Sequence, residues 1–99
     1  MAEKKMKLIK WDSADYLKTE KDIQTYLNVC LEEYSDDPVF IAKVLGTIAR
    51  ARGMSKIAKK TGLSREGLYK ALSGDGNPEF ATILKVMHAL GLKLQAKPI

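Results

Sequence analysis

The sequence has one cysteine, one histidine and no long hydrophobic run. Cys30 cannot form an internal disulfide, which favours a reduced, cytoplasmic compartment. No apolar stretch approaches the roughly 20 residues of a bilayer helix, and residues 1–10 lack the apolar core of a secretory signal, so we expect no membrane partner. Without a metal-ligand motif, a phosphate loop or an obvious pair of catalytic carboxylates, the sequence predicts no enzyme, metal site, cofactor or small-molecule substrate.

Charge is unevenly distributed along the 99 residues, whose 45% hydrophobic and 29% charged content is that of one ordinary globular domain. Residues 11–37 carry eight acids against two lysines, whereas residues 38–73 carry eight bases against Glu66 alone. This asymmetry predicts two surfaces with different partners, the basic one suited to a polyanion such as DNA. The alternative, that both blocks are solvated helix faces, stays open on charge alone.

Apolar spacing and capping residues predict a series of short helices. Thr19 and Asp22 have the spacing of a capping box, and Pro38 suits the first position of the next helix, capped by Asp36 or Asp37. Gly53 is expected to end that helix. Three more helices are predicted: one capped by Ser55 and ended by Gly62, one running from Ser64 to about Ser73, and one over 79–90.

The predicted elements define an all-α fold of five helices with short connections. We expect an acidic N-terminal extension over residues 1–37, with a short helical stretch over 11–17, and a helix-turn-helix portion over residues 38–99. Together they form one compact domain. The alternating tail of residues 92–96 predicts a short C-terminal edge strand.

The segment MSKIAKKTGLSREGLYKALS, residues 54–73, has the features of a helix-turn-helix. Ala58 is the small residue that lets the second helix pack close, and Gly62 supplies the positive φ of the turn. Leu63 is placed to fix the turn to the core, with Ile57 and Leu68 at the joint. The opposite side of the second helix is then left to enter a major groove.

This segment resembles the λ-repressor/Cro-like helix-turn-helix domains. Three blocks, WDSADYLKTEKDIQTYL, IARARGMSKIAKKTGLSREGLYKALSGDGNPEF and ILKVMHALGLKL, more closely resemble the addiction-module antidote family and cover most of the chain. The resemblance implies a five-helix λ-repressor-like domain and an antitoxin that neutralises a RelE/ParE-type toxin. It also implies a homodimeric, sequence-specific repressor of its own operon, bound to double-stranded operator DNA.

Arg65 is the foremost candidate for reading bases, because its guanidinium can pair with guanine O6 and N7, although a phosphate contact is the alternative. Glu66 either accepts from cytosine N4 or favours the helix N-terminus, and Tyr69 lies either at the core edge or in the groove. The predicted DNA-binding residues are Ser55, Lys56, Lys59, Lys60, Ser64, Arg65, Glu66, Tyr69 and Lys70.

Aromatic and apolar residues on the acidic segment are the candidates for toxin contact. We predict Trp11, Tyr16 and Leu17 as anchors, whereas Tyr26 and Tyr34 lie on an apolar stripe and are expected in the core.

Two positions depart from the family pattern: Met54 stands where glutamine is common, and Gly67 lies inside the recognition helix, where glycine costs about 1 kcal/mol relative to alanine. The competing hypothesis is a protein-interaction adaptor that has the helical fold but no DNA-binding role.

Overall fold

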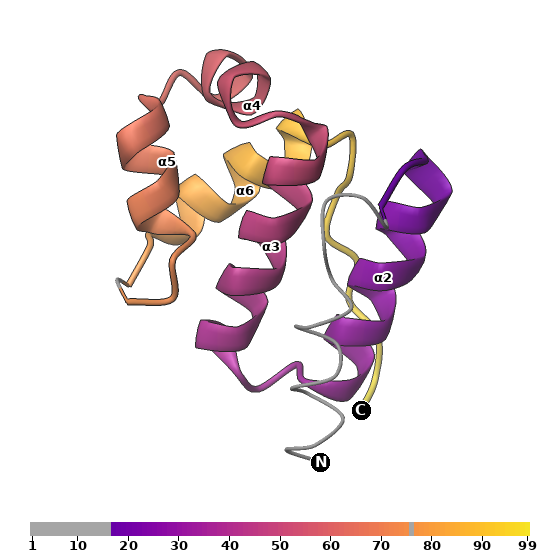
Figure 1. Ribbon diagram of the computed structural model, residues 1–99. Coiled ribbons are helices and arrows are strands. Elements are labelled where there is room, and N and C mark those ends of the chain that lie inside the picture. The colour runs from indigo at the N-terminus through magenta and orange to yellow at the C-terminus, as the bar shows by residue number, and fades with distance from the viewer. Residues whose placement is uncertain (1–16, 76) are drawn as a thin grey trace.

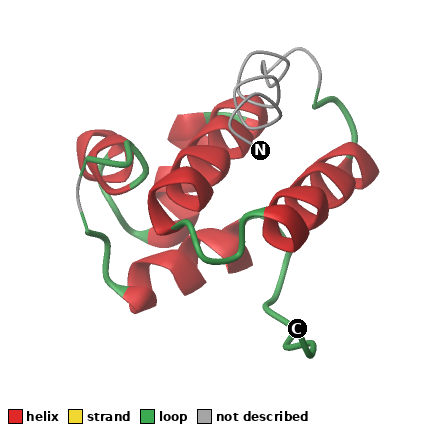
Figure 2. Ribbon diagram, turned by 90° about the horizontal axis from the view of Figure 1, so that it is seen from below, coloured by secondary structure: helices red, strands yellow, loops and turns green. Residues whose placement is uncertain are grey.

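The computed structural model describes residues 17–75 and 77–99, and within these ranges the chain is helical with no strand (Figures 1 and 2). The all-α prediction with five helices is confirmed. No described helix has the length and apolar character that a membrane crossing requires. The helices are α2 (Glu20–Glu33), α3 (Pro38–Arg52), α4 (Met54–Thr61), α5 (Arg65–Ala71) and α6 (Phe80–Ala89).

Side-chain caps fix where α2 and α3 begin, as predicted. The Thr19 hydroxyl accepts from the Asp22 N–H at 3.0 Å, and the Asp22 carboxylate accepts from the Thr19 N–H at 3.1 Å, which completes a capping box. Asp37 caps α3 by accepting from the Phe40 N–H at 3.0 Å, with Pro38 at the first helical position. These caps satisfy amide groups that would otherwise have no partner inside the helix.

Two predicted details are wrong. Ser55 does not cap the third helix: Gly53, at φ 101°, both ends α3 and precedes α4, so the helix begins at Met54 and Ser55 lies inside it. The tail over residues 92–99 forms no strand, because the described part of the chain offers no other strand with which it could form a ladder. Instead the Leu92 N–H donates to the Met87 carbonyl at 2.9 Å, which closes the end of α6.

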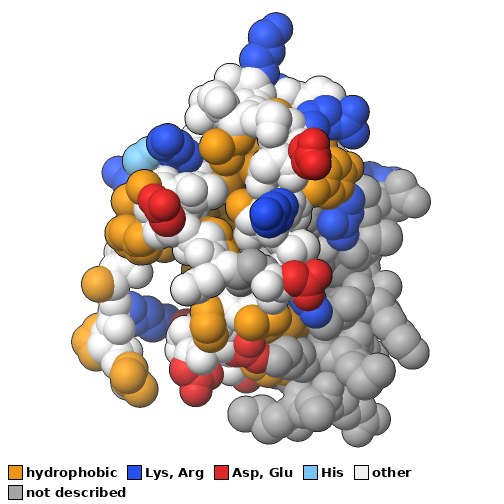
Figure 3. All heavy atoms as spheres, turned by 90° about the vertical axis from the view of Figure 1, so that its left-hand side faces the viewer, with side chains coloured by type: hydrophobic (Ala, Val, Ile, Leu, Met, Phe, Trp, Pro, Cys, Tyr) orange, Lys and Arg blue, Asp and Glu red, His pale blue; other side chains and the backbone are white. Residues whose placement is uncertain are grey.

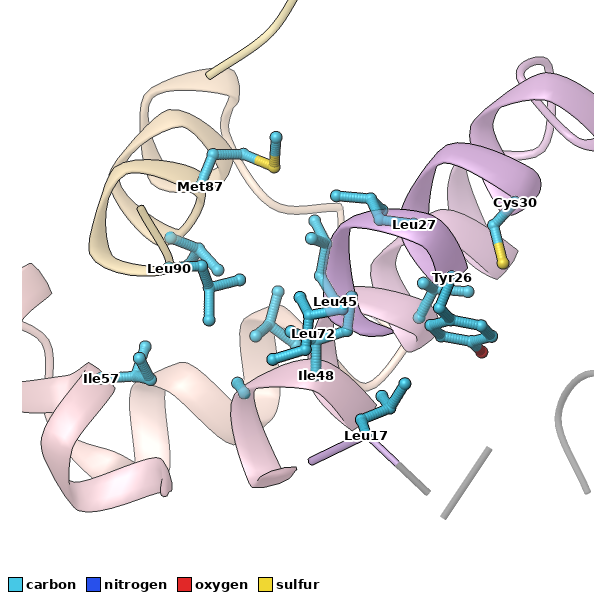
Figure 4. Close-up of a cluster of buried hydrophobic side chains, with 14 of the residues drawn as sticks. Leu17, Tyr26, Leu27, Cys30, Leu45, Ile48, Ile57, Leu72, Met87 and Leu90 are labelled. Atoms are coloured by element: carbon cyan, nitrogen blue, oxygen red, sulfur yellow. The ribbon is translucent and has the colours of Figure 1, made fainter. Parts of the chain in front are cut away.

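The core surrounds α3, which lies at the centre with α2 on one side and α4, α5 and α6 on the other (Figure 1). Side chains from all five helices meet there (Figure 4). Tyr34 packs edge-on against Phe40, with ring centroids 4.7 Å apart, and Tyr26 is also buried. The prediction that both tyrosines belong to the core is confirmed. Cys30 is buried in the same cluster.

Gly46 brings α3 close to the end of α5. A Cβ built at this position would lie 2.9 Å from the Leu72 carbonyl oxygen and 3.3 Å from the Leu72 Cβ. The hydrogen of glycine therefore allows the backbone of one helix to approach the end of another. Leu72 is buried, so this approach helps to hold α5 against the core.

Candidate nucleic-acid interface

The corner between α4 and α5 is built on Gly62. Its φ of 79° and ψ of 7° are left-handed, and its N–H donates to the Ala58 carbonyl at 2.9 Å. No atom lies within 4 Å of a built Cβ, so the backbone conformation, and not crowding, favours glycine here. The Thr61 hydroxyl adds a brace, since it donates to the Ala58 carbonyl at 3.0 Å and accepts from the Leu63 N–H at 3.3 Å.

The inward-facing side chains of α4 and α5 hold both helices of the corner against the core. Ile57 and Ala58 of α4 are buried, and Leu68 of α5 has no exposed surface. Leu63, in the turn, packs against the same core. The burial of Ile57, Ala58 and Leu68, together with the contact of the partly buried Leu63, sets which side of α5 faces outward, as the sequence pattern predicts.

The start of α5 explains the glycine inside it. The Gly67 N–H donates to the Ser64 hydroxyl at 2.9 Å, so Ser64 is the predicted N-cap. A Cβ at position 67 would lie 3.1 Å from that hydroxyl oxygen. Glycine therefore leaves room for the cap, which offsets part of its unfavourable helix propensity.

The outward side of the corner is polar and predominantly cationic. The five bases outnumber the single acid, Glu66, and all the predicted DNA-binding side chains are exposed. Figure 3 shows the α5 side of the molecule, with many Lys and Arg side chains over its upper part. The exposed residues are Ser55, Lys56, Lys59, Lys60, Ser64, Arg65, Glu66, Tyr69 and Lys70.

Arg65 and Tyr69 lie one turn apart on α5 and contact each other. The Arg65 guanidinium carbon is 6.0 Å from the centroid of the Tyr69 ring, at the outer limit of a cation–π contact. Tyr69 is therefore on the outward side of α5 and not at the core edge. Its ring lies beside the guanidinium that is predicted to read a base.

Two arginines at the end of α3 have other contacts. Arg52 forms an ion pair with Glu20 of α2, and Arg50 donates to the Thr47 hydroxyl at 3.0 Å. The basic block is thus divided: Arg52 joins α3 to α2, while the bases of α4 and α5 face outward.

The predicted toxin anchors are not brought together in the described chain. Trp11 and Tyr16 lie outside the described residues. Leu17 is 3% exposed and packs in the core (Figure 4), so its side chain is not available as a surface anchor. Among the described residues no group of three or more His, Cys, Asp or Glu side chains could hold a metal ion.

Some exposed apolar residues were not predicted as surface features, among them Phe80 and Val39. Phe80, the first residue of α6, has the spacing of the buried stripe of that helix, yet it is 65% exposed. Val39 is 46% exposed at the start of α3. Val39 does not have the helical spacing of the buried residues of α3, and this was the signal in the sequence that its side chain is exposed.

Comparison with known proteins gives one family and one relative. The sequence model of a family described as "Probable addiction module antidote protein" matches residues 7–98. A protein of Haemophilus influenzae, described as an uncharacterized protein, is 56% identical over 87 residues, which is 88% of each chain. No solved structure matches this chain.

Proposed function

The chain belongs to the family described as probable addiction module antidote proteins, and from this membership we propose that it is the antitoxin of a type II toxin–antitoxin module. In this role it binds and neutralises a RelE/ParE-type toxin. It also represses its own operon by binding operator DNA sequence-specifically through α4 and α5. This is a binding function that needs no catalytic residue.

One observation carries the DNA-binding part of the proposal: the side of α5 from Ser64 to Lys70 is exposed, while Leu68 fixes the opposite side in the core. A recognition helix must present its outer side to base edges in the major groove. Burial of that side within the monomer would have excluded docking.

We assign the contacts by side-chain chemistry. Arg65, in the first turn of α5, reads a guanine through its two parallel donors. Lys59 and Lys60 in the last turn of α4, together with Lys56 and Lys70, neutralise phosphates and fix the register on the duplex. The protein binds as a homodimer on two half-sites about 34–36 Å apart, one helical turn of DNA.

The test is a gel-shift titration on the DNA upstream of the protein's own reading frame, repeated over a range of salt concentrations. Because the lysines neutralise phosphates, the logarithm of the affinity is expected to fall linearly with the logarithm of the salt concentration. Arg65→Ala is expected to cost about 1–3 kcal/mol and to relax preference at one base pair. Lys59→Ala is expected to weaken all sequences alike and to reduce the salt slope by about one.

Lys85→Ala is the matched control, because Lys85 is an exposed lysine of α6 outside the corner. It is expected to keep the wild-type affinity and salt slope. Absence of any salt-sensitive shift by the wild-type protein would refute the repressor role and favour the adaptor alternative. The antitoxin role is tested separately, by co-purification with the product of the adjacent reading frame and by rescue of growth when that product is expressed.

A further inference from the structure

A small apolar groove lies at the N-terminal end of α3, whereas α4 follows the C-terminal end. It is enclosed by the end of α2, the first turns of α3 and the approach to α6, and its volume is about 260 Å³. That volume is below the roughly 300–1,000 Å³ of sites for small molecules, so the groove suits one or two protein side chains. Apart from Ser35 and Asn77 its lining is apolar: Leu31, Pro38, Val39, Ile41, Ala42, Pro78 and Ile83.

The segments that line this groove carry charge of one sign. Residues 31–42 contain four acids and no lysine or arginine, and residues 77–83 contain only Glu79. This is the reverse of the corner at α4 and α5, in a chain whose net charge is +5. The lower part of Figure 3 shows Asp and Glu side chains next to hydrophobic ones. An apolar groove with an acidic border is complementary to a cationic protein surface that projects an apolar side chain.

Two of the chain's own bases, Lys43 and Lys97, lie near the groove and reduce this negative charge. Lys43 follows the lining segment and lies beside Val39 and Gly74. Lys97 of the C-terminal tail forms an ion pair with Glu32, with Nζ 3.0 Å from Oε2. Asp37 is occupied as the cap of α3. Asp36 and Glu79 are both exposed at the border, where a partner can reach them.

We propose that this groove binds the toxin: an apolar side chain of the toxin inserts between α2, α3 and α6, and lysine or arginine residues around it face the acidic border. The inference rests on the proposed antitoxin function and names the surface that performs it. Anchors of this kind, buried at the centre of an interface and surrounded by polar contacts, supply much of the affinity of protein complexes.

The position of the groove leaves α4 accessible. The groove is at the N-terminal end of α3, and α4 follows its C-terminal end (Figure 1). A helix rises 1.5 Å per residue, so the 15 residues of α3 separate the two ends by about 22 Å. A toxin seated in the groove therefore does not have to cover the phosphate contacts of α4.

The experiment compares two valines in the full-length protein. Val39 lines the groove and is 46% exposed, whereas Val29 of α2 is 38% exposed and does not line it. Each is changed to arginine, and the affinity for the purified product of the adjacent reading frame is measured by titration calorimetry. We expect Val39→Arg to weaken binding at least about tenfold, because it fills the groove and repels a cationic partner. Val29→Arg is expected to stay within about twofold of wild type.

A second variant tests the border without altering the groove. Asp36→Lys is expected to slow association and to flatten its salt dependence, as loss of a border charge does in other complexes. Circular dichroism and the gel shift on upstream DNA check that Val39→Arg keeps its fold and its DNA affinity. Equal toxin affinity for Val39→Arg and wild type would overturn the groove assignment and leave the antitoxin role standing. Failure of the wild-type protein to bind the toxin would overturn both.

Two other occupants are distinguished in the same series. If Val39→Arg turns a dimer into a monomer in light scattering, the groove holds a second copy of the chain and the toxin assignment is wrong. In a separate variant the charges of Lys4, Lys5 and Lys7 are reversed. If Val39→Arg no longer weakens toxin binding in that variant, the chain's own N-terminal segment occupies the groove, and the assignment to the toxin is again wrong.

Discussion

At the scale of single residues, the two helical glycines differ in what a side chain would meet. A Cβ at Gly46 would contact the backbone oxygen of Leu72 at 2.9 Å, which cannot move without shifting the end of α5. A Cβ at Gly67 would meet only the Ser64 hydroxyl, at 3.1 Å, which is the end of a rotatable side chain. Substitution of Gly46 by alanine therefore tests close helix packing, whereas the same substitution at Gly67 tests helix propensity.

We predict that Gly46→Ala lowers the free energy of unfolding by about 1–3 kcal/mol, because overpacking outweighs the gain in helix propensity. Gly67→Ala is expected to stay within about 1 kcal/mol of wild type, because the gain in propensity and the strain on the cap oppose each other. Urea unfolding followed by circular dichroism measures both. Equal stability of Gly46→Ala and wild type would show that α5 moves freely to accept a methyl group.

At the scale of helices, the capping box of α2 makes stability depend on pH. The hydrogen bond from the Thr19 backbone N–H, foremost among several causes, lowers the pKa of Asp22 below its ordinary value. A carboxyl whose pKa is lowered by folding stabilises the protein above its unfolded pKa, and this contribution is lost as the pH falls through the folded value. The loss is therefore expected below about pH 4.

We predict that Asp22→Asn has a lower melting temperature than wild type at pH 7 and a shallower fall in melting temperature between pH 5 and pH 3. Asp75→Asn, at an exposed acid outside any helix, is the control and is expected to follow the wild-type profile. Thermal unfolding by circular dichroism over this pH range measures the effect. Parallel profiles for Asp22→Asn and wild type would show that the capping box does not contribute to acid sensitivity.

The elements that the sequence predicted correctly are those whose ends are set by local chemistry. Thr19 with Asp22, and Ser64 before α5, cap their helices through contacts three residues away, and Gly62 adopts its left-handed turn within the same segment. The residues 92–96 alternate as a strand would, but a strand exists only with a partner, and that depends on the rest of the fold. The apolar groove was not predictable for the same reason, since residues 31–42 and 77–83 meet only in the folded chain.

At the scale of the whole molecule, the two proposed surfaces differ in charge and in position: the groove is at the N-terminal end of α3 and α4 follows the C-terminal end, while α5 lies alongside α3 with Leu72 against Gly46. In the proposed arrangement the exposed bases of α4 and α5 bind DNA, and the acidic border of the groove binds a cationic toxin. A cationic toxin would not be repelled by DNA, and the distance of about 22 Å along α3 separates the groove from α4. The arrangement favours a ternary complex over competition.

We predict that the toxin, added to the protein–DNA complex, produces a slower-migrating band in a gel shift and does not release free DNA. Val39→Arg is expected to form the DNA band and fail to form the slower one, because only the groove is altered. A Lys59→Ala, Lys60→Ala double variant is expected to lose most of the DNA band and to keep its toxin affinity, because only phosphate contacts are removed. Release of free DNA by the toxin in proportion to its concentration would contradict this arrangement, because it would mean that the toxin covers the outer side of α4 and α5.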